Sequence, residues 1–220
     1  HTVFLDKSIS QEDLIKEINI LNEDDSVNGI LVQLPLPKHI DSQMIINSIN
    51  PMKDVDGLHV ENVGLLSQNH ARFVPCTPKG IMTLLDEYEI DLSGKDALVI
   101  GRSQLVGNPI ANLLKNKDMT VTQAHSKTKN LEEKIKNNEL IVVAVGVREM
   151  IKKEMLSEHH IVIDVGIHRH NGKLYGDVDK DAYDKVKMIT PVPKGVGPMT
   201  IVSLLENTLL AYQLQRRNHG

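Results

Sequence analysis

Near the start of the chain, apolar residues recur with spacings that predict a small α/β arrangement. In Ser10–Asn22 they recur every three or four positions, as on one face of an amphipathic helix, and Ser10 is a residue type that caps a first turn. Asp41–Ile49 has the pattern of a second, shorter helix. The apolar runs Thr2–Leu5 and Gly29–Leu34 predict strands, the second of which stops at prolines.

A longer alternation of strand and helix patterns follows. Short apolar runs alternate with amphipathic segments, which is typical of βαβ units in a mainly parallel, doubly wound sheet. The last two strands are separated by Asn171-Gly172, a strong hairpin signal. The predicted strands are Asp96–Ile100, Met119–His125, Leu140–Val145, Ile161–Val165 and Val186–Thr190, and the predicted helices are Lys79–Tyr88, Pro109–Asn116 and Asn130–Asn137.

The last helix is predicted at Met199–Arg217. It follows Pro191–Pro198, where prolines and glycines argue against regular structure. We therefore expect two α/β lobes. Residues 1–78 and 199–220 form the first lobe, to which the C-terminal helix returns, and residues 79–198 form the second.

Composition narrows the class of protein. Of the 220 residues, 40% are hydrophobic and 25% are charged, which suits a folded protein with a polar surface. The formal net charge of -4, without a long basic block, argues against nucleic acid as a partner. No apolar run reaches the roughly 20 residues of a membrane span, and no signal-peptide pattern opens the chain. A single cysteine, Cys76, cannot form an internal disulfide, so we expect a cytoplasmic protein.

The segment Gly101–Pro109 joins a predicted strand to a predicted helix. Glycine there permits a tight turn and lets a phosphate approach the backbone, and the helix N-terminus favours negative charge. The spacing departs from the usual G-x-G-x-x-G, because Ser103 takes the middle position and Gly107 comes one residue late. On this segment alone, a plain strand-to-helix turn explains the pattern equally well.

The end of the next strand favours NADP over NAD. NAD enzymes often place an acid there to bind the ribose hydroxyl groups. Here His125–Thr128 contains no acid, and Arg102, Ser126 and Lys127 are suited to a 2′-phosphate. The alternative is a solvated polar loop.

Five segments of the chain together carry a family pattern: Gly29–Pro37, Lys53–Gly57, Pro75–Gly80, Gly101–Pro109 and Gly195–Thr200. In this order they resemble the bifunctional methylenetetrahydrofolate dehydrogenase/cyclohydrolase family, and the resemblance covers essentially the whole chain. It implies an N-terminal α/β folate-binding lobe and a Rossmann-type, doubly wound NADP-binding domain. It also implies a homodimer formed through the nucleotide-binding domain.

The resemblance implies two reactions of one-carbon folate metabolism, which supplies purine biosynthesis. In the dehydrogenase step a hydride passes from the methylene carbon of 5,10-methylenetetrahydrofolate to NADP⁺, so the protein mainly aligns donor and acceptor. In the cyclohydrolase step water opens the methenyl product to 10-formyltetrahydrofolate, which requires proton transfers. The implied ligands are tetrahydrofolate derivatives and NADP.

The resemblance places two residues of this chain in catalysis. Gln33 matches the glutamine that contacts the family's catalytic lysine, although a polar strand-end residue is the alternative. Asp56 matches the aspartate that binds the pterin edge through paired N–H bonds, although Asp-Gly also favours a plain turn. The implied substrate-binding residues, among which the cysteine lines the site and is no nucleophile, are Gln33, Leu34, Pro35, Asp56, Cys76, Gly197, Pro198 and Thr200.

Cofactor-binding residues are expected at or just after strand ends, where open α/β sheets place their ligands. The predicted set is Thr77, Gly101, Arg102, Ser103, Val106, Gly107, His125, Ser126, Val145, Gly146, Asp164, Gly166 and Ile167.

Two departures from the family pattern affect the expected activity. The family's catalytic tyrosine and lysine, spaced Y-x-x-x-K, belong to a helix before the first strand seen here, and we expect the N-terminal segment carrying them to be missing. Tyr183 and Lys187 have this spacing but run into a predicted strand, so we interpret them as coincidence. The closing loop has Lys194 where the family usually has glycine, and this side chain either alters loop closure or points outward.

Alternatives stay open at this point. Without the lysine, the chain is also compatible with a non-catalytic folate- or nucleotide-binding relative. A short-chain-type dehydrogenase using Tyr183 and Lys187 predicts a glycine-rich turn near the chain start, whereas the turn is at Gly101. No metal site is expected: the histidines at 159, 160, 168 and 170 lack one-face spacing, and the alternating aspartates at 177, 179 and 181 lack the rest of an EF-hand.

Overall fold

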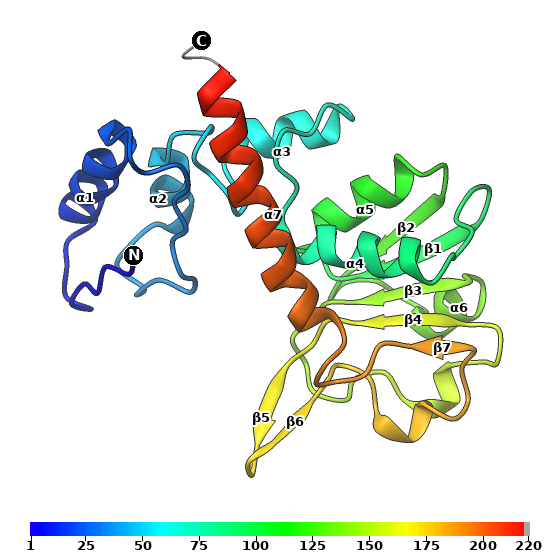
Figure 1. The fold of residues 1–220 in the computed structure, drawn as a ribbon. Helices are drawn as coiled ribbons and strands as arrows, with labels where there is room; N and C mark the ends of the chain where they lie inside the picture. Colours follow the sequence, from blue (N-terminus) through cyan, green and yellow to red (C-terminus); the bar gives the residue numbers. More distant parts are fainter. Residues whose placement is uncertain (218–220) are drawn as a thin grey trace. The chain divides into compact units, whose positions relative to one another are not determined.

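The computed structural model describes residues 1–217, which fold as two compact units (Figure 1). Unit 1 consists of His1–Val74 and the described part of Leu204–Gly220, and unit 2 consists of Pro75–Ser203. The sequence predicts a folate-binding lobe and an NADP-binding lobe with their own boundaries. This division into functional domains stays a prediction.

Unit 2 is built on a five-stranded parallel sheet, as the alternating pattern predicts. The strands lie in the order β2-β1-β3-β4-β7, and each neighbouring pair is parallel. The sequence-based strand predictions are confirmed, with shorter bounds for all but the first. The strands are β1 (Asp96–Ile100), β2 (Thr120–Ala124), β3 (Leu140–Val143), β4 (Ile161–Asp164) and β7 (Met188–Ile189).

Helices cover both faces of this sheet (Figure 1). In β3, Leu140 and Val142 pack into the cluster beneath α4 (Cys76–Glu87) and α5 (Gly107–Lys115). Ile141 and Val143 point to the opposite face. That second face is covered by α6 (Leu131–Lys136) and two 3₁₀ turns, η1 (Lys153–Met155) and η2 (Lys180–Ala182). All four residues of β3 are buried, which explains its continuous apolar sequence.

The predicted hairpin forms between β5 (His168–His170) and β6 (Lys173–Tyr175), which pair antiparallel. Asn171 and Gly172 have φ angles of 48° and 74°, as a type I′ turn requires. This hairpin follows β4, so its first strand continues directly from one of the predicted cofactor loops.

Unit 1 contains the helices α1 (Gln11–Glu23), α2 (Ser42–Ser48) and α3 (Val60–Ser67). The Ser10 hydroxyl caps α1 by accepting the Asp13 N–H at 3.1 Å, as predicted. The strands predicted at Thr2–Leu5 and Gly29–Leu34 are wrong, because an apolar run becomes a strand only where it finds a partner. Among the described residues, the second run makes one isolated bridge, from Ile30 to Asp54.

The C-terminal helix α7 (Val196–Arg217) begins in unit 2 and continues into unit 1. It starts before the predicted Met199, because Pro198 is its third residue, where a missing N–H costs no helical hydrogen bond. In unit 1 the Asn207 amide donates to the carbonyl oxygens of Val55 and Val74, each at 2.9 Å. None of the helices described over residues 1–217 is both long and apolar enough to cross a membrane.

Candidate functional site

The carboxyl ends of the parallel strands in unit 2 gather most of the predicted cofactor residues. The chain runs from β1 to β2 on one side and returns to β3 on the other side of β1, so the loops after β1 and β3 diverge. An open sheet binds its ligand at such a point of reversed strand order. The predicted residues there follow β1, β2, β3 and β4.

The loop after β1 is tightly folded around two glycines. Gly101 has a φ of 127°, and a β-carbon there would overlap the carbonyl oxygen of Ala144. The Ser103 hydroxyl accepts the N–H groups of Val106 and Gly107 at 3.2 and 3.3 Å. Ser103 therefore shapes the loop by holding the first turn of α5, a role that its place in the motif did not reveal.

Polar side chains at the ends of β1 and β2 lie in solvent. Arg102, Ser126 and Lys127 are exposed, and β1 and β2 are neighbours in the sheet. The Nδ1 atom of His125 accepts the Lys127 N–H at 3.2 Å, which orders the backbone of this loop. A cation and a hydroxyl on adjacent strand ends suit a phosphate on the cofactor's ribose.

The loops after β3 and β4 are organised by two buried carboxylates. Asp164 accepts the N–H groups of Gly166, Asp177 and Val178 at 3.0, 2.9 and 3.0 Å. Burial raises the pKa of Asp164 to about 6, against these three hydrogen bonds, which lower it. Because the Asp164 carboxylate is buried and occupied in this way, we assign it to loop structure and no direct cofactor contact.

Asp177 is the functional candidate that sequence reasoning missed. Its side chain is fully buried, and its Oδ2 accepts the N–H groups of Val145 and Gly146 at 2.8 and 3.0 Å. Its Oδ1 lies 2.8 Å from Nε2 of His168. The alternating aspartates around it gave no hint of this role, because the groups it binds lie about thirty positions upstream.

The start of α7 packs against the start of α4 within unit 2. The Thr77 and Thr200 hydroxyls are 3.0 Å apart, and a β-carbon on Gly80 would lie 2.8 Å from that of Met199. Gly197 faces Ile167, whose Cδ1 would lie 3.7 Å from an added β-carbon. The structure thus brings the predicted residues Thr77 and Thr200 together, and it places Ile167 close to Gly197.

Asp56 lies in unit 1, in a turn closed by a 3.2 Å hydrogen bond from the Gly57 N–H to the Asp54 carbonyl. Asp56 is half-buried in this turn, so its place in a turn does not exclude a binding role. Gln33 is exposed, and its amide donates to the Leu34 carbonyl at 2.9 Å. The bridge between Ile30 and Asp54 places the chain segments leading to Gln33 and Asp56 side by side.

Lys53, which belongs to the family segment Lys53–Gly57 but received no role of its own from the sequence, anchors this turn. It is buried, and its Nζ donates to the carbonyl oxygens of Leu21, Asn22 and Asp24 at 3.1, 2.7 and 2.8 Å. A cation suits the carbonyl end of α1. The ammonium group therefore fixes the backbone three residues before Asp56.

The remaining predicted residues divide between the units. Leu34 is half-buried and Pro35 exposed in unit 1, whereas in unit 2 Cys76 is buried and Pro198 is exposed. Cys76 is buried as a small hydrophobic residue usually is, and its role as a lining residue stays a prediction. Tyr183 and Lys187 lie on no common helix, because Tyr183 ends η2 and Lys187 directly precedes β7. This arrangement removes the basis for a short-chain-type dehydrogenase.

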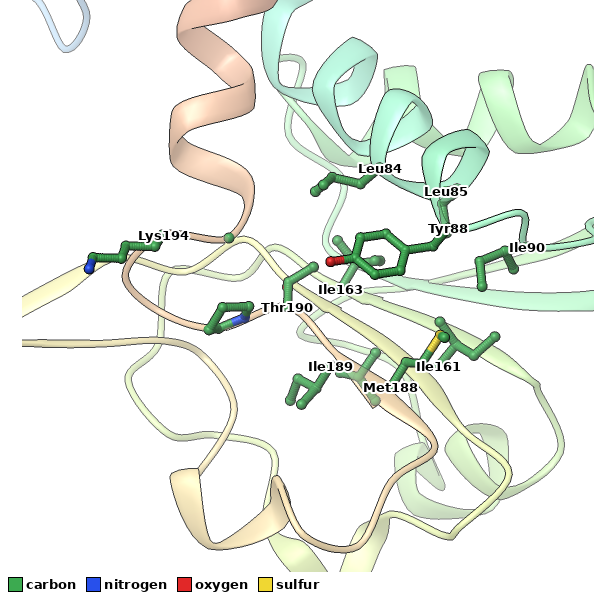
Figure 2. A pocket seen from close by; sticks show the side chains of 13 residues that line it. Leu84, Leu85, Tyr88, Ile90, Ile161, Ile163, Met188, Ile189, Thr190 and Lys194 are labelled. Carbon is green, nitrogen blue, oxygen red and sulfur yellow. The ribbon is translucent and has the colours of Figure 1, made fainter.

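An apolar groove of about 290 Å³ on unit 2 is lined by residues of α4, β4 and β7 and of the segment before α7. Figure 2 shows Tyr88 reaching into it from the end of α4, above residues of β4 and β7, while Lys194 extends away from it. The groove contains none of the predicted cofactor residues. We therefore do not assign it to the nucleotide.

Comparison with known proteins decides the family. The model of the tetrahydrofolate dehydrogenase/cyclohydrolase NAD(P)-binding domain matches residues 75–216, and that of the catalytic domain matches residues 1–56. This chain belongs to the tetrahydrofolate dehydrogenase/cyclohydrolase family. Bifunctional protein FolD of Campylobacter fetus is 56% identical over 216 residues, which cover 97% of this chain and 76% of that protein.

Solved structures of this family have the same fold. Bifunctional FolD of Campylobacter jejuni superposes with a TM-score of 0.93 at 50% identity, covering 96% of this chain and 76% of that one. Trypanosoma brucei FolD, solved with NADP and an inhibitor, gives a TM-score of 0.93 at 38% identity and covers 99% and 77%. The two-domain α/β fold expected from the resemblance is therefore confirmed.

Proposed function

We propose that this chain takes part in the NADP-dependent oxidation of 5,10-methylenetetrahydrofolate and the hydrolysis of the methenyl product to 10-formyltetrahydrofolate. The observation that carries the proposal is the tightly folded glycine loop after β1 in unit 2, in a chain that belongs to the tetrahydrofolate dehydrogenase/cyclohydrolase family. The FolD relatives are named as bifunctional enzymes. The non-catalytic relative is thereby the weaker alternative.

NADP is the cofactor. Gly101 and Gly107 lie close together and have no side chains. A pyrophosphate could therefore approach the backbone at the start of α5. Arg102 and Ser126 would hold the 2′-phosphate. When bound, the nicotinamide accepts the hydride, and the protein contributes alignment and exclusion of water.

The folate is assigned to unit 1. Asp56 would accept two N–H bonds from the pterin edge, and Gln33, Leu34 and Pro35 would line the same site. Lys53 supports the assignment, because a buried ammonium with three carbonyl partners holds the Asp56 turn in one conformation. Asp56→Asn should therefore weaken folate binding about tenfold or more and leave NADP⁺ binding unchanged.

A homodimer formed through unit 2 is part of the proposal, with the cytoplasm as its site of action and no nucleic acid or membrane as partner. The apolar groove supports an interface there, because Tyr88 at its rim is 66% exposed and Met188 is 37% exposed. Tyr88→Glu should shift the protein from dimer to monomer in sedimentation equilibrium. A wild-type protein that sediments as a monomer would remove this part of the proposal.

The activity is tested with the protein as its gene encodes it. NADPH formation from 5,10-methylenetetrahydrofolate and the decay of methenyltetrahydrofolate should both be catalysed. Lys187→Met is the matched control, since Tyr183 and Lys187 are the only Y-x-x-x-K pair in the 220 residues and should leave both rates unchanged. Failure of the wild type to form NADPH would contradict the dehydrogenase assignment, and a large loss in Lys187→Met would return that pair to the active site.

A further inference from the structure

We infer that Asp177 and His168 are positioning residues for the cofactor, because one buried carboxylate sets the spacing between the loops after β3 and β4. The inference rests on the proposed function, together with the expectation from the sequence that Val145, Gly146 and Ile167 bind NADP. Neither Asp177 nor His168 is expected to touch the cofactor. Both act through the backbone that they hold.

The Asp177 carboxylate joins the two loops directly. Its Oδ2 accepts the N–H groups of Val145 and Gly146, at 2.8 and 3.0 Å, at the end of β3. Its Oδ1 lies 2.8 Å from Nε2 of His168, the residue that follows the exposed Ile167 after β4. The carboxylate is fully buried, so these hydrogen bonds are shielded from water and define one geometry.

Close packing prevents the carboxylate from moving. The Asp177 N–H donates to Asp164 at 2.9 Å, which fixes the backbone at one side. On the other side, a β-carbon on Gly166 would overlap the Asp177 carboxylate, and one on Gly176 would overlap that of Asp164. The two glycines therefore let the two loops approach the carboxylates as closely as the backbone allows.

The number of donors explains why the central group is a carboxylate. Two backbone N–H groups, of Val145 and Gly146, converge on one oxygen, and the His168 ring meets the other, donating when Nε2 carries the proton. A carboxylate offers acceptors to all three groups, whereas the NH₂ group of an amide would face either the two backbone N–H groups or the His168 ring. His168 completes the set from the outside, since its side chain is 22% exposed and can be removed without opening the core.

A binding experiment separates positioning from a purely structural role. His168→Ala, with His170→Ala as the control on the exposed hairpin, is titrated with NADP⁺ and with adenosine 2′,5′-bisphosphate. The bisphosphate carries only the half of the cofactor assigned to Arg102 and Ser126. We expect His168→Ala to bind NADP⁺ about tenfold more weakly or worse, as for a lost charge-assisted hydrogen bond, and to bind the bisphosphate within about twofold of wild type. His170→Ala should match wild type with both probes.

The outcomes distinguish this inference from the proposed function. Unchanged NADP⁺ binding in His168→Ala, with a wild type that binds NADP⁺, overturns the inference alone. Equal losses of NADP⁺ and bisphosphate mean general loosening of the unit and also overturn it. A wild type that binds neither probe overturns the proposed function, and the inference with it. Asp177→Asn, checked for cooperative unfolding, should repeat the His168→Ala pattern with a larger loss of NADP⁺ affinity.

Discussion

A β-carbon added to Gly107 would lie 2.5 Å from the carbonyl oxygen of Gly101. The two glycines are six positions apart, yet the loop between them folds back so that the first turn of α5 touches the end of β1. The Ser103 hydroxyl holds this turn from within the loop. The nucleotide loop is therefore recognisable by its contacts, although its spacing departs from the usual glycine pattern.

Gly107→Ala should open this loop, because the new methyl group meets backbone that cannot move away without displacing β1. We expect NADP⁺ affinity to fall about tenfold or more, by calorimetric titration. Gly64→Ala is the matched control, since a β-carbon there meets nothing within 4 Å. It should leave binding unchanged and stabilise α3 by roughly 0.5–1 kcal/mol. Equal NADP⁺ affinity in Gly107→Ala and wild type would contradict the assigned loop.

Lys194 stands where the family usually has glycine, and its φ of 77° explains that preference. A side chain in the left-handed region costs roughly 1–2 kcal/mol, which glycine avoids, although its greater freedom in the unfolded chain offsets part of the gain. Lys194→Gly should therefore raise the free energy of unfolding by about 0.5–1 kcal/mol in denaturant melts. Lys194→Ala removes the same charge but keeps the β-carbon, and it should give no such gain. A stabilisation of equal size in both variants would show that removal of the charge, rather than relief of backbone strain, raises the free energy of unfolding.

Protonation of His160 should lower the free energy of unfolding in acid. Burial, together with the neighbouring His159, lowers its pKa from 6.5 to about 4. Between these values the unfolded chain binds the proton and the folded protein does not. The stability contribution is therefore complete above about pH 6.5 and is lost as the pH falls toward 4, by about 3 kcal/mol.

The variant His160→Asn isolates this effect. Asparagine can still accept the Ser157 N–H, which His160 binds through Nδ1 at 2.8 Å, but it does not titrate. Both proteins keep Asp164, whose raised pKa works in the opposite direction, since its stability contribution falls as the pH rises from 3.8 to about 6. The stability difference between wild type and His160→Asn should shrink by about 3 kcal/mol as the pH is lowered from 6.5 to about 4. A difference that stays constant with pH would mean that His160 does not titrate in this way.

The sheet of unit 2 was predictable because its central strands are buried on both faces and appear as continuous apolar runs. The hairpin was predictable because Asn171-Gly172 suits one turn type. The short helix α3 gave a weaker signal, since it begins at a His59 cap and contains Gly64. The apolar run Gly29–Leu34 failed as a strand prediction because pairing depends on a partner that a single segment does not reveal.

In the candidate site, too, some features could be predicted from the sequence and others could not. The positions of the strand-end residues followed from the alternation of strands and helices, so most of the predicted cofactor set lies at one edge of the sheet. The roles of Asp177 and Lys53 depend on backbone groups about thirty residues away in sequence. A single sequence carries no local pattern for such contacts, and the structure was needed to find them.

The central claim is that this chain holds NADP at the carboxyl ends of the unit 2 strands, with Arg102 and Ser126 on the 2′-phosphate. The most direct test is calorimetric titration of the 220-residue chain with NADP⁺ and with NAD⁺. A charge-assisted contact of roughly 1.5–3 kcal/mol predicts NADP⁺ binding about tenfold or more tighter than NAD⁺, with that preference lost in Arg102→Ala. Equal affinity of the wild-type chain for the two dinucleotides would contradict the account.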